Sequence, residues 1–379
     1  MTILQMQPDQ PGDIVLSYVE VGDEGVPTGK RLTFSGVEFR PLGYSDLSGM
    51  RPGQNVIIPL NWQNAKVIES TVEGIAIDSI ASANATLQSP FSSKTIGLVK
   101  GGWLPSGLAL QANMIVLPDR CTISEMSRRF RNGAKTKEED RDFLDIFADR
   151  SVRINPLLFA LEGNLRAAPS AAVVEQQLEE AYEKVREALP HAKLEPEGKT
   201  GLPGVIGIVQ DTNSSMASKR DFLIHLAPRL HSPVSAERKA LLWDEVLVAA
   251  DSFGIPRQSL TVVAALSAVA VPNGRSPAKR LLKLKAGYTV EDAYNALADL
   301  RALEVMMCLF ALYPHEKLML CTGDKDLALF WAGIQAHDFR WSGEHASFSI
   351  SPVDDLLPNV SAAQIAAFLT QVQGESLEN

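Results

Sequence analysis

Two short apolar runs, far apart in the chain, each end at a polar loop that carries an aspartate. Residues 114–118 (MIVLP) precede Asp119, and residues 317–321 (KLMLC) precede a loop that contains Asp324. Apolar runs of this length, bounded by polar turns, are typical of buried strands in a parallel sheet. In an open α/β sheet, ligands bind outside the carboxyl ends of the strands. The two runs therefore predict an α/β fold with a cluster of carboxylates at one edge of a sheet.

The rest of the chain divides into regions of different expected structure. Residues 1–112 hold short β-branched runs separated by Gly and Pro, which predicts a β-rich accessory region. We expect a core formed by two segments, 113–168 and 290–336. A helical insertion at 169–289 would separate them, and a tail would follow at 337–379. Within them we expect a short strand at 205–209, a helix end at Pro228 and a helix at 362–373.

The composition, with 45% hydrophobic and 21% charged residues, is that of an ordinary globular protein. A net charge of −9 argues against a protein that coats nucleic acid by bulk charge, but not against local basic patches. Three cysteines without a metal-binding spacing indicate reduced thiols, and the N-terminus lacks a signal-peptide pattern, so we expect a cytoplasmic protein. The longest apolar run, at about 260–271, is too short to span a bilayer, so no membrane partner is expected.

Two acidic residues in the first half of the chain are candidates for a catalytic or metal site. Asp119 closes the first strand, although an aspartate there could equally act as the N-cap of the following helix. Glu162 interrupts an apolar segment, where a carboxylate needs a metal or a cationic partner. Pairing of Glu162 with Arg153 or Arg166 is the alternative.

Two further candidates lie near the C-terminus. On a helix at 295–307, Asp299 shares a face with Asn295, whereas Glu304 lies about 140° around the helix from Asp299. We prefer Asp299 as the third acid, with Glu304 and an unimportant solvated face as alternatives. Asp324 is the fourth acid. Asp326 follows it at a spacing that suits a metal-binding loop or an ordinary polar turn.

These acids together predict a hard divalent cation. Carboxylate oxygens are the ligands that Mg²⁺ and Mn²⁺ prefer, and such sites commonly serve phosphodiester chemistry. Phosphate contacts would come from Thr322, Lys325 and a basic run at 273–285, unless that run is only a solvated helix face. The residues of the run that we expect to bind substrate are Arg275, Lys279 and Arg280. A second basic run, at 128–137, is more typical of a solvated face.

Taken in order, these motifs resemble PIN-domain nucleases. Residues 119–125 (DRCTISE) are similar to the family's opening, in which strand 1 ends in Asp before a polar turn and a helix with Ser-Glu. Glu162, Asp299 (or Glu304) and Asp324 resemble the second, third and fourth acids. The resemblance implies a three-layer α/β/α fold with a parallel central sheet. It also implies metal-assisted hydrolysis of nucleic acid, RNA rather than DNA, in which the four acids hold one or two Mg²⁺ or Mn²⁺ ions and Thr322 positions a phosphate or the nucleophile. From its spacing in the loop we add Asp326 as a further metal ligand. The insertion at 169–289 and the Arg-Cys pair after Asp119 depart from the family pattern.

Two other functions stay open. A haloacid-dehalogenase-type phosphatase also has a late Gly-Asp motif, but its first motif needs a second Asp at the position of Cys121. A non-catalytic nuclease-like scaffold could bind nucleic acid, or a protein partner through the N-terminal region or the insertion. A role in a toxin–antitoxin or phage-defence pair would be compatible with either the nuclease or the scaffold.

Overall fold

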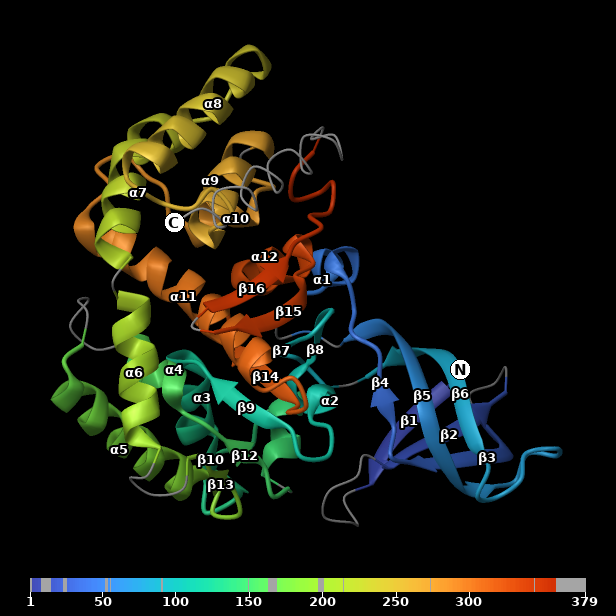
Figure 1. Cartoon of the computed structure of the whole chain (residues 1–379). Helices are drawn as coiled ribbons and strands as arrows, with labels where there is room; N and C mark the ends of the chain where they lie inside the picture. The colour runs from blue at the N-terminus through green and yellow to red at the C-terminus, as the bar shows by residue number, and fades with distance from the viewer. Residues whose placement is uncertain are drawn as a thin grey trace. The chain divides into compact units, whose positions relative to one another are not determined.

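The computed structural model describes residues 2–7, 15–22, 26–51, 54, 56–89, 91–148, 150–162, 169–196, 201–213, 215–272, 274–343 and 345–358. The chain divides into two compact units, each built from three segments (Figure 1). Unit 1 comprises Met1–Phe159, Gln177–Gly201 and Tyr313–Ala328. Unit 2 comprises Ala160–Gln176, Leu202–Leu312 and Leu329–Asn379.

The first sheet of unit 1 is antiparallel and is formed by the N-terminal residues. Its strands are β1 (Thr2–Gln7), β2 (Val15–Val21), β3 (Pro27–Ser35), β4 (Glu38–Phe39), β5 (Ile57–Ser70) and β6 (Ile80–Gln88). Buried and more exposed residues alternate along β5, so that Ile58, Leu60 and Trp62 lie in the core. This alternation is expected of a sheet with one solvated face. The N-terminal residues are therefore rich in strands, as their sequence predicts.

The second sheet of unit 1 has the strand order β13-β12-β9-β14-β7-β8. Its strands are β7 (Ile96–Val99), β8 (Gly102–Pro105), β9 (Ile115–Pro118), β12 (Arg153–Ile154), β13 (Lys193–Leu194) and β14 (Leu318–Thr322). The strands from β13 to β14 run parallel, whereas β7 and β8 are antiparallel to their neighbours. The two apolar runs that end near an aspartate are thus the adjacent parallel strands β9 and β14. The predicted mixed α/β architecture with parallel strands is confirmed.

The strand order creates a change of direction between β9 and β14. From β9 the chain continues to β12 and β13 on one side, and β14 lies on the other side of β9. This is the topological switch point of an open sheet, where loops at the carboxyl ends diverge and leave room for a ligand. β7 and β8, which precede residue 112, complete the same sheet beside β14. The boundary predicted at residue 112 therefore runs through this sheet.

Short helices surround the switch point. α3 (Arg120–Arg129) begins directly after β9 and packs against β9 and β14, and α12 (Lys325–Ile334) begins directly after the loop that follows β14. The remaining short elements of this part of the chain are α1 (Tyr44–Gly49), α2 (Ser106–Ala109), the hairpin of β10 (Phe130–Arg131) and β11 (Ala134–Lys135), the 3₁₀ helix η1 (Phe143–Phe147), and α4 (Leu157–Glu162).

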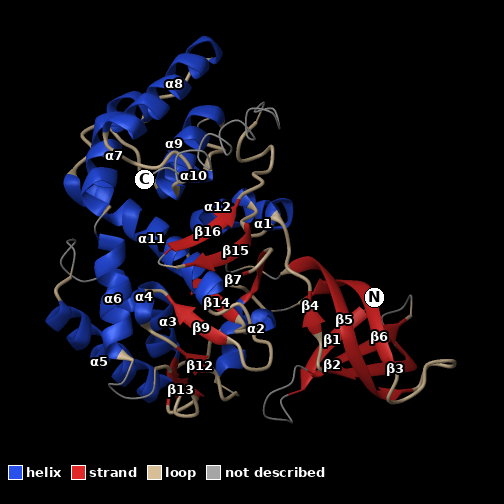
Figure 2. Cartoon of the chain, viewed as in Figure 1, coloured by secondary structure: helices blue, strands red, loops and turns tan. Residues whose placement is uncertain are grey.

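Unit 2 is mostly helical (Figure 2). The helices after α4 are α5 (Ala171–Ala188), α6 (Leu202–Asn213), α7 (Met216–Leu230), α8 (Ala236–Ser252), α9 (Leu260–Ala270), α10 (Pro277–Leu281) and α11 (Val290–Leu312). A hairpin of β15 (His337–Ser342) and β16 (His345–Ser349) packs against α11. The sequence pattern does not predict this hairpin.

Two local predictions in this region are wrong. Residues 205–209 lie inside α6, because a short apolar run does not by itself distinguish a strand from a helix. Pro228 lies inside α7, which continues to Leu230, because buried residues such as Leu226 and Leu230 keep the last turn packed. The helix predicted at 362–373 lies outside the described residues. No helix among the described residues is long and apolar enough to cross a membrane.

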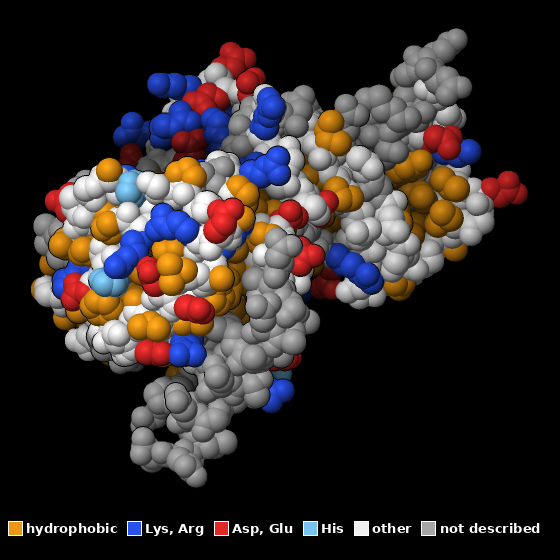
Figure 3. All heavy atoms as spheres, turned by 90° about the horizontal axis from the view of Figure 1, so that it is seen from above, with side chains coloured by type: hydrophobic (Ala, Val, Ile, Leu, Met, Phe, Trp, Pro, Cys, Tyr) orange, Lys and Arg blue, Asp and Glu red, His pale blue; other side chains and the backbone are white. Residues whose placement is uncertain are grey.

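Exposed apolar side chains gather on the N-terminal part of unit 1 (Figure 3). The large exposed apolar residues of the first sheet and its loops are Val26, Ile57, Ile68, Ile75, Ile77 and Ile80. Three of them, Ile57, Ile77 and Ile80, keep 64%, 58% and 67% of their surface exposed. Single exposed apolar residues are normal on soluble proteins, whereas groups of them often mark interaction sites.

Candidate functional site

The carboxyl ends of β9 and β14 bring Asp119 and Asp324 into one site. Cys321 pairs with Pro118 in the parallel ladder, and the Asp119 backbone N–H donates to the Cys321 carbonyl oxygen at 3.0 Å. Asp119 follows β9 directly, and Asp324 lies two residues beyond the end of β14. The negative charge of Asp324 contributes to raising the pKa of Asp119, as expected for carboxylates at adjacent strand ends. The site therefore lies at the switch point of the sheet.

Asp119 is the N-cap of α3. Its Oδ1 accepts a hydrogen bond from the Thr122 backbone N–H at 2.6 Å, and the residue is only 8% exposed. Burial raises the pKa of the Asp119 carboxyl, and the charge of Asp324 raises it further, while hydrogen bonds from Thr322 and Thr122 oppose both effects. The capping role that the sequence left open is real, and it fixes the orientation of a carboxyl group that is costly to ionise.

Asp324 has the same local role at the start of α12. Its Oδ1 accepts hydrogen bonds from the backbone N–H groups of Asp326 at 2.8 Å and Leu327 at 3.0 Å. Its own N–H donates to the Thr322 hydroxyl oxygen at 2.9 Å. Thr322 is fully buried and interacts with both carboxylate residues, so it orders the site rather than presenting its hydroxyl group to solvent.

Neither carboxylate of this pair is neutralised by a basic side chain. Across the described residues, Asp119 and Asp324 form no ion pair with Lys, Arg or His. Buried carboxylates are normally paired, bound to a metal or protonated, because an isolated buried charge is very costly. Asp119, the buried member of the pair, is stabilised by hydrogen bonds from Thr122 and Thr322, and it could also hold a proton or bind a cation.

Basic residues close in sequence to the pair are engaged elsewhere. Arg120, directly after Asp119, lies over the Phe159 ring, with Cζ 4.2 Å from its centroid. The Lys325 ammonium donates to the backbone carbonyl oxygens of Ser48, at 3.2 Å, and Met50, at the end of α1. Arg128 makes ion pairs with Glu125 at 2.7 Å and with Glu139. The contribution of Lys325 to phosphate binding that the sequence predicts would require these carbonyl contacts to break.

The basic run at 128–137 is largely neutralised in the same way. The Arg129 side chain is 1% exposed, and its guanidinium binds both oxygens of Asp145, at 2.5 and 2.9 Å. Lys135 pairs with Asp145 at 2.7 Å, and Arg131 pairs with Glu187 at 2.8 Å. These residues stabilise the fold around η1, which favours the interpretation of this run as structural.

Glu162 and Asp299 belong to unit 2, so unit 1 alone does not gather the four predicted acids. Asp299 forms an ion pair with Lys283 at 2.9 Å, and the alternative acid, Glu304, pairs with Lys219 at 2.7 Å. Glu162 is half-buried at the end of α4, where its carbonyl oxygen accepts a hydrogen bond from the Tyr294 hydroxyl at 3.2 Å. Each of these acidic residues therefore contacts other residues of unit 2.

The predicted substrate-binding run also belongs to unit 2. The Lys279 ammonium donates to the Ser232 carbonyl oxygen at 3.0 Å, and Arg280 donates to the Gly274 carbonyl oxygen at 3.0 Å. Arg275 is exposed. Lys279 therefore joins α10 to the segment after α7, whereas Arg280 helps to close a local turn, and a role in binding nucleic acid stays a prediction.

Unit 1 offers few metal ligands, so it fits only a Mg²⁺ site in which the protein supplies one or two carboxylates. Among the described residues, no group of three or more His, Cys, Asp or Glu side chains is arranged to hold a metal. Mg²⁺, however, often keeps several waters and binds through only one or two carboxylates together with substrate phosphates. Asp119 and Asp324 suffice for that arrangement, and Asp326, which is half-buried two residues after Asp324, is close in sequence.

Strand β7, which borders the site, is not predicted by the sequence. β7 pairs with β14 so that Ile96 lies opposite Thr322, and the Lys94 carbonyl oxygen lies 3.6 Å from the position that a Cβ would take on Gly323. The only sequence signal for this strand is the apolar run at 96–99, which does not say which sheet it joins. Because 3.6 Å is an ordinary contact, packing does not require a glycine at position 323.

Comparison with known proteins gives no relative for this chain. No family model, curated protein or solved structure matches it. The site therefore has to be interpreted from its own geometry.

Proposed function

We propose that Asp119 and Asp324 hold Mg²⁺ or Mn²⁺ and that the protein hydrolyses phosphodiester bonds of nucleic acid. The resemblance of the motifs to PIN-domain nucleases points to RNA as the substrate. The observation that supports the proposal is the buried Asp119 carboxyl group, which has no basic partner among the described residues and lies beside a second carboxylate. Its place at the switch point of a parallel sheet is where ligands of such sheets bind.

Asp119, Asp324 and Thr322 would have different roles in this reaction. A bound divalent cation would act as a Lewis acid and lower the pKa of a coordinated water. Asp119 and Asp324 would hold it in a fixed position, because each carboxylate is already oriented by the helix that it caps. Oδ1 of Asp324 accepts two N–H groups, which leaves Oδ2 for the cation. Thr322 would keep the loop in this conformation through its bond to the Asp324 N–H.

Mutagenesis tests the remaining acidic and basic residues that the sequence predicts for the site. Glu162, Asp299 and Asp326 are the acidic residues to be tested as further ligands, and Arg275, which is exposed, would contact the nucleic acid backbone together with Lys279 and Arg280. Asp299 would first have to leave Lys283, and Lys279, Arg280 and Lys325 would have to leave carbonyl oxygens that they now bind.

The direct test is cleavage of labelled single-stranded RNA and DNA in EDTA, Mg²⁺ or Mn²⁺. Wild type is compared with Asp119→Asn and with Asp244→Asn, which removes one negative charge from an exposed position on α8. We expect metal-dependent cleavage that is lost in Asp119→Asn and kept in Asp244→Asn. Equal activity of the wild type and Asp119→Asn would remove this site from the reaction.

A non-catalytic scaffold is the second candidate, and one observation favours it. Both carboxylates cap helices, so both residues have a structural reason to be aspartate without any metal. The exposed isoleucines of the first sheet would then serve a protein partner. A folded wild-type protein that neither cleaves RNA nor binds Mn²⁺ in equilibrium dialysis would favour this function over the nuclease.

A further inference from the structure

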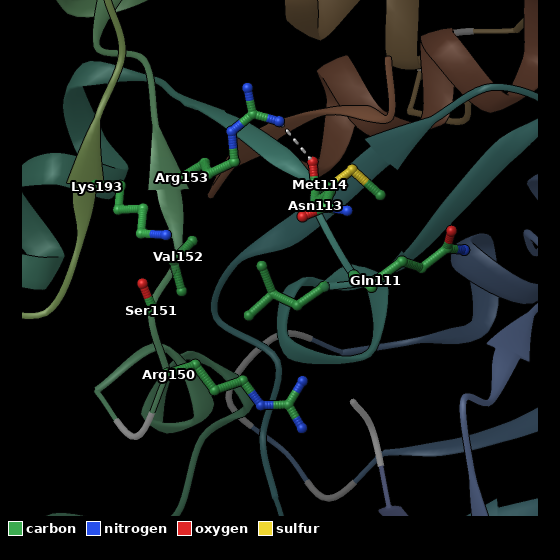
Figure 4. A pocket seen from close by; sticks show the side chains of 10 residues that line it. Gln111, Asn113, Met114, Arg150, Ser151, Val152, Arg153 and Lys193 are labelled. Carbon is green, nitrogen blue, oxygen red and sulfur yellow. Dashed lines mark hydrogen bonds between the residues drawn. The ribbon is translucent and has the colours of Figure 1, made fainter. Parts of the chain in front are cut away.

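A pocket of about 260 Å³ lies at the opposite end of the second sheet from the carboxylate pair. It is formed within unit 1 by residues 110–114, which lead into β9, by residues 150–153, which lead into β12, and by Lys193 of β13. Figure 4 shows Lys193, Ser151 and Arg150 along one wall and Gln111 and Asn113 along the other. The pocket thus lies at the amino ends of the parallel strands.

The lining of this pocket is basic. Arg150, Arg153 and Lys193 contribute to it, and none of the lining residues that the structure describes is Asp or Glu. Arg153 is compensated from outside the lining, since it pairs with Glu195 at 3.0 Å and Glu316 at 3.2 Å. These pairs and a bond to the Asn113 carbonyl oxygen at 3.1 Å hold its guanidinium in place.

Lys193 differs from Arg153 because its side chain is exposed and its ammonium makes no hydrogen bond or ion pair in the described part of the chain. The ammonium is therefore available to an anion that enters the pocket. The side chains of Gln111, Asn113 and Ser151 offer neutral hydrogen-bond donors for the same ligand.

We propose that this pocket binds the phosphate group of a small phosphorylated molecule. Arginine and lysine side chains together favour phosphate, because guanidinium groups bind its oxygens in pairs and ammonium groups add a compact charge. A water occupies about 30 Å³ in the liquid, so 260 Å³ corresponds to about nine waters, which is room for a phosphate group and the nearest atoms of the molecule that carries it. The four residues of β9 separate the pocket from Asp119 by about 13 Å, so the two sites are distinct.

Binding to the intact protein is measured by isothermal titration calorimetry with inorganic phosphate, AMP and adenosine at constant ionic strength. We expect saturable binding of AMP and no binding of adenosine, because the phosphate group is what the basic lining recognises. Binding of inorganic phosphate with an affinity equal to that of AMP would identify the free anion as the ligand, which still assigns the site to phosphate. Absence of saturable binding by both phosphate and AMP would overturn the proposal.

Variants place the binding in this pocket. Lys193→Gln and Arg150→Gln should each weaken binding by about tenfold or more, because each removes a charged hydrogen-bond donor. Lys193→Arg should retain binding, since the charge stays. Lys137→Gln is the matched control, because Lys137 is exposed, lies outside the lining and carries the same charge. If Lys137→Gln weakens binding as much as Lys193→Gln does, the effect is one of overall charge and the pocket is not the site.

Discussion

The replacement of Asp119 by asparagine separates its role as a helix cap from its proposed role as a metal ligand. Asn and Asp are equally good N-caps, so in Asp119→Asn the side-chain amide oxygen can still accept the Thr122 N–H. Alanine cannot, and the loss of a cap costs about 0.5–2 kcal/mol. We therefore expect Asp119→Ala to lower the free energy of unfolding by this amount, and Asp119→Asn to change it little at low pH.

The pH decides whether wild type or Asp119→Asn is the more stable protein. Because the folded-state pKa of Asp119 is raised, the folded protein binds its proton more tightly than the unfolded chain does. Stability from this group is then fully present below the unfolded pKa and is lost as pH rises through the higher folded pKa. Each tenfold difference in proton affinity corresponds to about 1.4 kcal/mol. Above the folded pKa, Asp119→Asn should therefore be more stable than wild type in EDTA.

Urea unfolding at several pH values, with EDTA or with Mn²⁺, measures both effects. Mn²⁺ should stabilise wild type at high pH and leave Asp119→Asn unchanged, since ligands that bind only the folded state raise its stability. The same preparations are assayed for RNA cleavage. The reasoning is refuted if Asp119→Asn is less stable than wild type in EDTA across the whole pH range, or if it cleaves RNA as wild type does.

Three other substitutions test the assignments made for neighbouring charges. Asp299→Asn should cost about 0.2–1 kcal/mol in urea unfolding and leave cleavage unchanged, because it weakens a partly exposed pair with Lys283; a loss of cleavage as large as that of Asp119→Asn would make Asp299 part of the site. Arg129→Met should cost about 1–3 kcal/mol in the same assay, since Asp145 loses two hydrogen bonds from a buried guanidinium but keeps its pair with Lys135, and a cost below about 0.5 kcal/mol would contradict this. Lys325→Gln should lower the thermal stability and leave RNA affinity in a filter-binding assay unchanged, whereas a selective loss of affinity would show that Lys325 contacts the nucleic acid.

The parts of the site that the sequence predicts are those with a local signal. β9 and β14 are recognisable because an apolar run stops at a polar turn, and the capping role of Asp119 follows from its place before a helix. The ion pair between Asp299 and Lys283 joins residues on different elements, so spacing within one helix cannot reveal it. The same holds for the contact of Lys325 with the carbonyl oxygen of Ser48, far away in the sequence.

Some strands of the second sheet have too weak a sequence pattern to be predicted. β12 and β13 are each two residues long, which is shorter than any hydrophobic pattern can define. β7 and β8 have an apolar pattern, but they adjoin the strands of the first sheet in sequence, so the pattern alone groups them with that sheet. Which sheet a short strand joins is decided by pairing with distant residues, here those of β14.

The pairing of β7 with β14 has a practical consequence for the preparation of shorter proteins. A fragment that starts at residue 113 would lack β7 and β8 and would leave β14, whose five residues are all buried, as an exposed edge of the sheet. Unpaired edges with apolar side chains are templates for aggregation. Such a fragment should precipitate or associate. Removal of the first ninety residues would keep β7 and β8 but would take away Leu42, whose backbone pairs with Trp103 of β8, and the α1 carbonyl oxygens that bind Lys325. A deletion that tests the N-terminal sheet should therefore end before Leu42.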